Sequence, residues 1–442
     1  MLSSDLLRFF LIIAGLLHLQ LGDWLPPYVR YGGDLLLVIL FIILVSSKNG
    51  AGIEIKRTGQ IIGVTFFTLN VLYVIYSFLF WGELLLVVRL ARQSLLFSMY
   101  LYIVSKLYGI SPKRMQKYRV ELIFLVFLAL NTLLAGLKIY LPTYSEEAVL
   151  FQGLPVRKIF VRGSVGLYLL PLFWGRADKR TYSYQVWVAV TIFYFLIVAR
   201  YILPFRSWFV VFAVVLTIYA LMYAFYYGKK LSNKDALYFI VLIILLVLSI
   251  LYLKDQPSSI KEWLSSLIID VRTGGGTFEY RLVRDWSRVT VQFEDHWIYI
   301  LLGYGFVHPE SSAAAHLGFS TETNDTGIVQ FLLTYGLVGT LFFFVLWFRW
   351  IYICIKNFLA TGIDGYLRIA FVLIIMVGML LSSNFFAWET FFVPILLTIG
   401  ILQVRITQTL KKCNFSLIKN MEEKNENSTY GRYKIGNTPT GW

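Results

Sequence analysis

Apolar runs of about 20 residues recur along this chain, from its first residues to about residue 405. A helix of that length crosses the hydrocarbon of a bilayer, and a helix also satisfies its own backbone hydrogen bonds, as a spanning segment in lipid must. Of the 442 residues, 58% are hydrophobic and 15% are charged, which is unlike a soluble domain. The sequence therefore predicts an all-α polytopic membrane protein.

The apolar runs predict about twelve membrane helices. Their expected ranges are 4–22, 33–47, 59–80, 84–108, 119–139, 155–175, 184–203, 207–227, 236–253, 327–348, 366–383 and 389–405. One large loop, residues 254–326, separates the ninth helix from the tenth and is long enough to indicate a function. We expect a membrane domain over residues 1–405, which includes this loop, and a polar tail over residues 406–442.

Basic residues concentrate in alternate short loops, which sets the expected orientation. Lys and Arg are frequent in 109–118 and 228–235, and less frequent in the alternate connections, which are expected on the outer side. By the positive-inside rule, both termini and the polar tail are cytoplasmic, and loop 254–326 lies on the outer side. The formal net charge of +15 is then mostly topogenic, so we predict no nucleic-acid partner.

Arginine interrupts several apolar runs near their expected outer ends. Arg89 and Arg92 stand three apart in LLLVVRLARQSLLF, so they share one helical face, and Glu83 is the main carboxylate expected near them. Each arginine could snorkel to lipid headgroups, but cations without protein counter-charges favour an anionic ligand such as a lipid diphosphate. The other arginines expected at this depth are Arg157, Arg162, Arg200 and Arg206.

The large loop carries a second group of arginines. Arg281, Arg284 and Arg288 follow helical spacing in YRLVRDWSRV, either as a solvated basic face or as further contacts to an anionic glycan substrate. The following LLGYGF, residues 301–306, predicts a tight turn that returns the chain to the membrane surface.

Titratable residues gather where the loop ends, in HLGFSTETNDTGIVQ. Asn324 or Asp325 is the expected N-cap of the next helix, while Asp325, Glu322 and His316 are candidate proton acceptors beside the anion site. The four histidines lack the spacing of metal ligands, so we predict no metal and no cofactor.

The loop exit resembles the O-antigen polymerase and O-antigen ligase superfamily of bacterial envelope glycan assembly. In the ligases a histidine, then Asn, Ser or Gln, precedes nine residues and GxxG; here GLVG, residues 336–339, follows TGIVQFLLTY, and Asp325 with Thr326 occupies the first two positions. This departure favours a Wzy-type polymerase. The arginine of FRSW and the YRLVRDW…LLGYG pattern are also similar to stretches of the superfamily.

The resemblance implies metal-independent glycosyl transfer at the periplasmic face of the inner membrane. Donor and acceptor are glycans on undecaprenyl diphosphate, arginines stabilise the departing diphosphate, and Asp325, then Glu322, then His316 are the expected bases. A chain-length regulator protein is an implied partner. The alternatives are an O-antigen ligase acting on lipid A core, against which Asp325 argues, and a lipid-linked oligosaccharide flippase, against which the large loop argues.

Overall fold

The computed structural model describes residues 4–19, 28–47, 54–107, 148–151, 154–157, 285–293, 297–322, 326–382 and 392–410. Within these residues, every regular element is a helix except for one short hairpin. The helices are α1 (Ser4–Leu19), α2 (Val29–Ser46), α3 (Glu54–Trp81), α4 (Leu84–Leu107), α13 (Asp285–Phe293), α14 (Trp297–Leu302), α15 (Ser312–Leu317), α16 (Gly327–Thr361), α17 (Asp364–Ser382) and the helix Phe392–Leu410.

Five of the described helices are long and apolar enough to cross a membrane, namely α2, α3, α4, α16 and Phe392–Leu410. This agrees with the predicted helical, multi-pass membrane protein. The expected spans 119–139, 184–203, 207–227 and 236–253 lie outside the described residues, as do most of the large loop and the tail after residue 410. The total of about twelve helices therefore stays a prediction.

The predicted start of the sixth span, at Pro155, is wrong. Strand β2 (Leu154–Arg157) covers this position and pairs antiparallel with β1 (Ala148–Phe151), with Val149 opposite Val156. β-branched valine favours strands, and proline has no amide hydrogen for a helix or a ladder, although it is tolerated at a strand edge. These local preferences explain why the apolar run does not enter a helix here.

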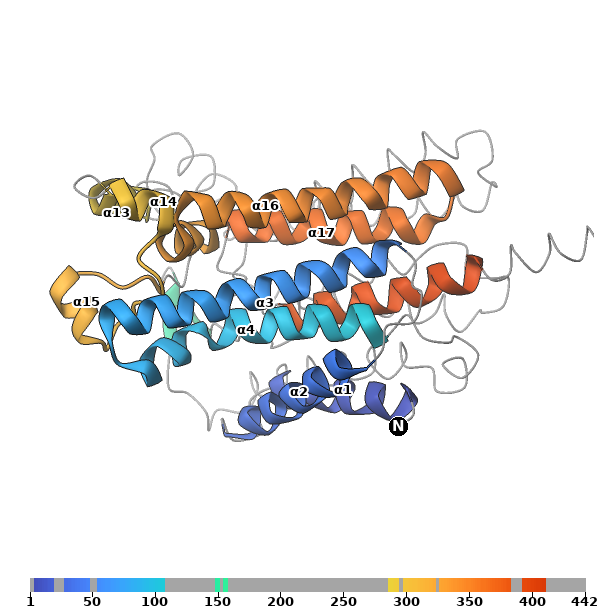
Figure 1. Cartoon of the computed structure of the whole chain (residues 1–442), viewed down its shortest axis with the longest axis horizontal. Coiled ribbons are helices and arrows are strands. Elements are labelled where there is room, and N and C mark those ends of the chain that lie inside the picture. The colour runs from blue at the N-terminus through green and yellow to red at the C-terminus, as the bar shows by residue number, and fades with distance from the viewer. Residues whose placement is uncertain are drawn as a thin grey trace, which may run out of the picture.

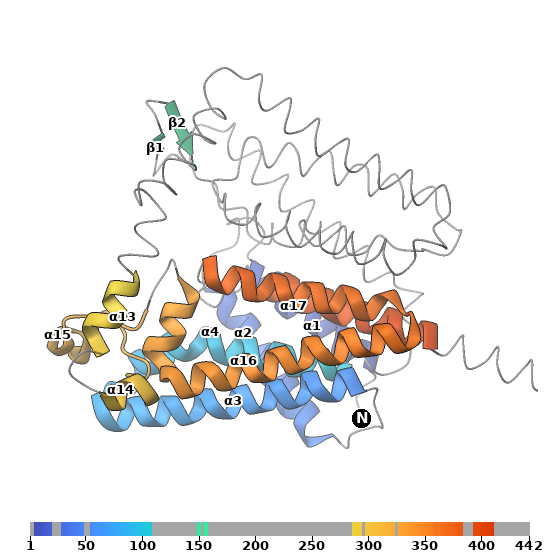
Figure 2. The same ribbon diagram turned by 90° about the horizontal axis from the view of Figure 1, so that it is seen from above.

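The long helices lie side by side along one axis and form antiparallel pairs, so that their ends gather at the two ends of the bundle (Figures 1 and 2). A two-residue turn, Gly82–Glu83, joins α3 to α4, and a similarly short connection joins α16 to α17. The three short helices α13, α14 and α15 lie where α3 ends and where α4 and α16 begin. We call this the loop end of the bundle; the chain's N-terminus lies toward the opposite end.

Aromatic side chains fill the space between the long helices. Trp347 and Trp350 of α16 are fully buried, and the Trp347 indole donates to the Leu373 carbonyl of α17 at 3.1 Å. Asn70 of α3 is a polar residue buried in this core: its amide donates to the Ser94 carbonyl of α4 at 3.4 Å, and its oxygen accepts from the Tyr335 hydroxyl of α16. Pairing of these buried polar groups fixes three helices against one another.

Cations close the carboxyl ends of two helices at the opposite end of the bundle. The Lys106 ammonium donates to the carbonyls of Leu44 and Ser47 at the end of α2, the latter at 3.0 Å. Arg8 donates to the Leu107 carbonyl at the end of α4, at 3.2 and 2.9 Å. The last carbonyls of a helix lack internal donors and carry partial negative charge, so buried cations stabilise them there.

Replacement of Lys106 by methionine should lower the free energy of unfolding by about 1–3 kcal/mol, because it removes a charged donor from buried carbonyls but keeps the apolar stem. Thermal unfolding in detergent measures the effect. Lys356→Met is the matched control, because Lys356 is exposed on α16. Equal melting temperatures for the two variants would contradict the capping role.

Candidate functional site

A backbone break in α16 is the first feature of the loop end. Gly336 has φ 62° and ψ −170° within an otherwise continuous helix. The chain after the break cannot bond to the carbonyls just before it, and the loop supplies the donors instead. The Tyr304 amide donates to the Leu333 carbonyl at 2.7 Å, and the Gly305 amide donates to the Thr334 carbonyl at 3.0 Å. The two glycine motifs of the sequence, GYG and GLVG, thus meet in space.

Glycine is required on both sides of this contact. Gly303 has φ 75°, and a Cβ built on it would overlap the Gly336 amide nitrogen; a Cβ on Gly336 would overlap the Gly303 amide nitrogen and the Leu301 carbonyl. Only glycine combines a positive φ with such close approach of two backbones.

One face of α3 binds the carbonyls of the same turn. The Tyr73 hydroxyl donates to the Leu302 carbonyl at 2.8 Å, the Tyr76 hydroxyl to the Gly303 carbonyl at 3.2 Å, and the Trp81 indole to the Tyr304 carbonyl at 2.7 Å. These three donors recur at helical spacing. We call residues 302–306, held between α3 and α16, the GYG turn.

The expectation that Arg89 and Arg92 lack acidic protein partners is wrong. Arg92 makes a bidentate ion pair with the Asp34 carboxylate, with Nε 2.7 Å from Oδ2 and Nη2 2.9 Å from Oδ1. Both side chains are 20% exposed. Arg89 Nη1 lies 3.0 Å from Glu310 Oε2, and both of these side chains are 63% exposed. The partners come from α2 and from the segment before α15, so spacing along α4 could not reveal them.

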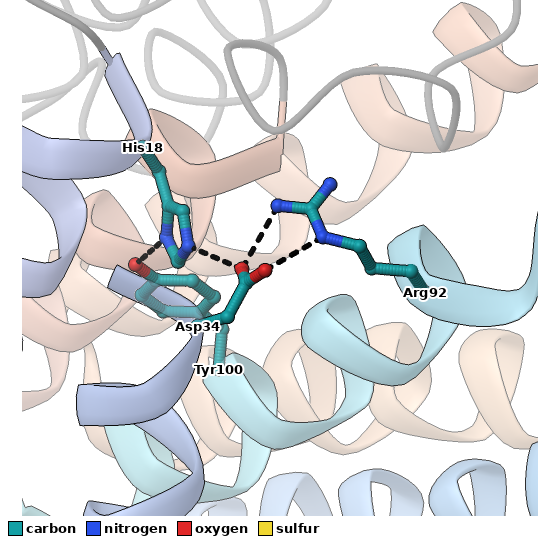
Figure 3. Close-up of polar contacts among 4 residues, drawn as sticks. All are labelled: His18, Asp34, Arg92 and Tyr100. Atoms are coloured by element: carbon teal, nitrogen blue, oxygen red, sulfur yellow. Dashed lines mark hydrogen bonds and ion pairs between the residues drawn. The ribbon is translucent and has the colours of Figure 1, made fainter. Parts of the chain in front are cut away.

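Asp34 also joins a buried network that the sequence analysis missed (Figure 3). His18 Nε2 lies 2.8 Å from Asp34 Oδ1, and His18 Nδ1 lies 2.6 Å from the Tyr100 hydroxyl. The tautomer that fits is an Nε2–H donating to Asp34 while Nδ1 accepts from Tyr100. The network ties α1, α2 and α4 together, and a signal for it was present: Asp34 is the only acidic residue in the predicted span 33–47.

Glu83 does not pair with the arginines but holds α15. Its backbone adopts φ 52° in the turn between α3 and α4, and its Oε1 accepts from the Ser312 amide at 3.0 Å. Hydrogen bonds from the Ser312 hydroxyl and amide, with a smaller contribution from His308, hold the pKa of Glu83 below its ordinary value. Glu83 is therefore an ionised carboxylate at neutral pH that fastens the α15 segment to the bundle.

Two hydrogen bonds between Val307 and Thr321 close the segment that contains α15. The Thr321 amide donates to the Val307 carbonyl at 3.1 Å, and the Val307 amide donates to the Thr321 hydroxyl at 2.9 Å. His316 lies exposed in the last turn of α15, and Glu322 is half-buried directly after the closure. Two of the three predicted bases are thus at the loop end.

Asp325, the remaining predicted base, lies outside the described residues. The structure nevertheless corrects the predicted N-cap of the helix that follows it. Helix α16 starts at Gly327, with Thr326 as its N-cap residue, so the prediction of Asn324 or Asp325 at that position is wrong. Thr326 is itself an N-cap residue type, and the following Gly-Ile-Val-Gln continues as helix, which moves the boundary by one residue or more.

The remaining predicted arginines are only partly placed. Arg157 ends β2, and Arg288 lies within α13 at the loop end. The described residues do not include Arg162, Arg200, Arg206, Arg281 and Arg284.

The comparisons with known proteins identify no family for this chain. No family model matches the chain, and no characterised protein matches it either. The function is therefore inferred from the residues of the chain itself and from the short motifs described above.

Proposed function

We propose that this protein is a membrane glycosyltransferase that joins lipid-diphosphate-linked oligosaccharide repeats into a polysaccharide of the O-antigen type. One observation carries the proposal. The GYG turn and the GLVG segment, which were separate motifs of the resemblance, meet at the loop end, where Arg89, His316 and Glu322 also lie. An assembly of these residues on rigid helices is a suitable frame for a site at the membrane boundary.

In the proposed reaction, a hydroxyl of the acceptor sugar attacks the anomeric carbon of the donor. The glycosidic bond forms as the bond from that carbon to the diphosphate breaks, and the hydroxyl proton passes to a base. Asp325 is the first candidate for the base, followed by Glu322 and His316. The diphosphate leaves with the bonding electrons, so its negative charge grows in the transition state and a guanidinium there accelerates the reaction.

The two arginines of α4 receive different roles. Arg89 is exposed, and its pairing with the equally exposed Glu310 contributes at most about 1 kcal/mol, so a diphosphate can replace that carboxylate. Arg92 is held by Asp34 in a fork, so we assign it to positioning α2 against α4. Arg89 is therefore the first candidate for binding the phosphate groups. The arginines beyond the described residues are further candidates.

Reconstitution tests the function. Purified full-length protein in nanodiscs, given undecaprenyl-diphosphate-linked repeat units and a chelator, should produce a ladder of lengthened glycans. Transfer to lipid A core without a ladder would instead indicate a ligase. Movement of the lipid-linked repeat across liposomes, with no new glycosidic bond, would indicate a flippase. Either result overturns the proposal.

Arg89→Lys should slow polymerisation about tenfold, because lysine keeps the charge but loses the paired donors of guanidinium. The melting temperature should be unchanged, since the side chain is exposed. Arg349→Lys is the control, because Arg349 is exposed on α16 nearer the opposite end of the bundle. A parental rate of ladder formation in Arg89→Lys, at equal protein level, would exclude Arg89 from phosphate binding.

A further inference from the structure

The GYG turn docks well inside the helix ends. Tyr73, which binds it from α3, stands eight residues before the end of that helix at Trp81, or about 12 Å at the helical rise. Gly336, which it meets, lies at the break within α16 rather than at an end of that helix.

Apolar side chains face outward beyond this depth, toward the loop end. Leu79 and Phe80 are 73% and 61% exposed in the last turn of α3. Exposed leucine and phenylalanine on a spanning helix face lipid hydrocarbon. On this face of α3 the hydrocarbon therefore extends to the end of the helix, and the GYG turn lies at hydrocarbon level.

The protein itself supplies partners for most of the backbone groups of the GYG turn. Its four amides at 303–306 donate to Tyr299, Leu333, Thr334 and Ser77, and its carbonyls at 302–304 accept from Tyr73, Tyr76 and Trp81. A loop in water needs no such set of side-chain donors. Non-helical backbone at membrane depth does need them, because lipid offers no hydrogen bonds.

Helix α14, which leads into the turn, is apolar on its outer surface. Its sequence is WIYILL, and Trp297, Ile298, Ile300, Leu301 and Leu302 are all exposed. The helix packs beside α16, whose Leu337, Val338 and Leu341 are also exposed directly after the break. The exposed apolar surface of α14 is thus continuous with the lipid-facing surface of a spanning helix.

We propose that α14 and the GYG turn form a re-entrant membrane segment, with the side chains of α14 in contact with lipid acyl chains. The expected tight turn at the membrane surface is then displaced into the bilayer, and the large loop enters the membrane before α15 leaves it again. This inference holds whatever reaction the protein catalyses. Bilayer hydrocarbon covers the exposed apolar surface of α14, because the flanking surfaces of α3 and α16 are lipid-facing.

Site-directed spin labelling tests the proposal in liposomes. Single cysteines at Ile298→Cys and Leu301→Cys, in a chain with its native cysteines replaced by alanine, should collide often with oxygen and rarely with an aqueous nickel chelate. Leu341→Cys is the lipid control, and Ala315→Cys, exposed on α15, is the water control. The oxygen-to-nickel ratio at 298 and 301 should match that at 341 and exceed that at 315 several-fold.

An unmodified chain provides a second measurement that does not depend on tolerance of substitutions. A diazirine that partitions into the bilayer should label the peptide that contains residues 297–302 and spare the peptide that contains α15. Nickel accessibility at 298 and 301 equal to that at 315, or absence of diazirine label from 297–302 while α16 is labelled, would overturn the re-entrant assignment.

Discussion

Alanine at Gly336 should sharply reduce the yield and melting temperature of the folded protein. The φ of 62° and ψ of −170° lie in a region that only glycine enters easily, which alone costs alanine about 1–3 kcal/mol. The new methyl group would also overlap the Gly303 amide and the Leu301 carbonyl, so the GYG turn would have to leave its place. Size-exclusion profiles and thermal unfolding in detergent measure the loss.

Gly318→Ala is the matched control for this prediction. Gly318 ends α15 with φ 74°, but a Cβ there meets open space, so its variant carries the conformational cost of about 1–2 kcal/mol and no overlap. Gly303→Ala should resemble Gly336→Ala, and the double variant should cost less than the sum, because both disrupt one contact. A Gly336→Ala protein as stable as Gly318→Ala would refute the docking of the turn.

Apolar patterning located several membrane helices but not all of their ends. The expected 84–108 became Leu84–Leu107, and 366–383 became Asp364–Ser382. Helix α16 runs from Gly327 to Thr361 rather than to 348, because Arg349 does not end a helix whereas Gly362, in the left-handed region, does. Charge alone is a poor helix terminator near a membrane boundary, where long cationic side chains reach water.

The meeting of the GYG and GLVG segments could not be predicted from the sequence. Each segment was visible as a motif, but their contact depends on backbone hydrogen bonds and on donors from α3, more than 220 residues earlier in the chain. A local sequence pattern indicates where the conformational freedom of glycine is required. It does not indicate which other backbone segment contacts that glycine. The same limit explains why Glu310 was not recognised as the partner of Arg89.

The physical reason for suspecting the membrane arginines was sound, but it led to the wrong partner for Arg92. A buried cation requires a compensating anion, and α2 supplies one in Asp34. The predicted second span began at residue 33, so Asp34 fell at its edge, whereas α2 begins at Val29 and places Asp34 within the helix. Two adjacent glycines, Gly32 and Gly33, lower the local helix propensity there.

Asp34→Asn should therefore destabilise the protein strongly, by about 3–5 kcal/mol, because it removes the counter-charge of a largely buried Arg92 and one of the two oxygens that accept from its guanidinium. Asparagine has nearly the same shape, but its amide group would face the guanidinium, donor against donor. Glu310→Gln is the control: it removes the carboxylate of an exposed pair and should cost no more than about 1 kcal/mol.

A second substitution separates charge from shape. In Asp34→Asn/Arg92→Gln, two neutral amides can hydrogen-bond to each other and no charge remains unpaired, so part of the lost stability should return. Thermal unfolding of the single variants, the double variant and the parent forms the complete cycle. Equal losses for Asp34→Asn and Glu310→Gln, or a double variant no more stable than Asp34→Asn, would contradict the view that Asp34 makes Arg92 tolerable within the membrane helices.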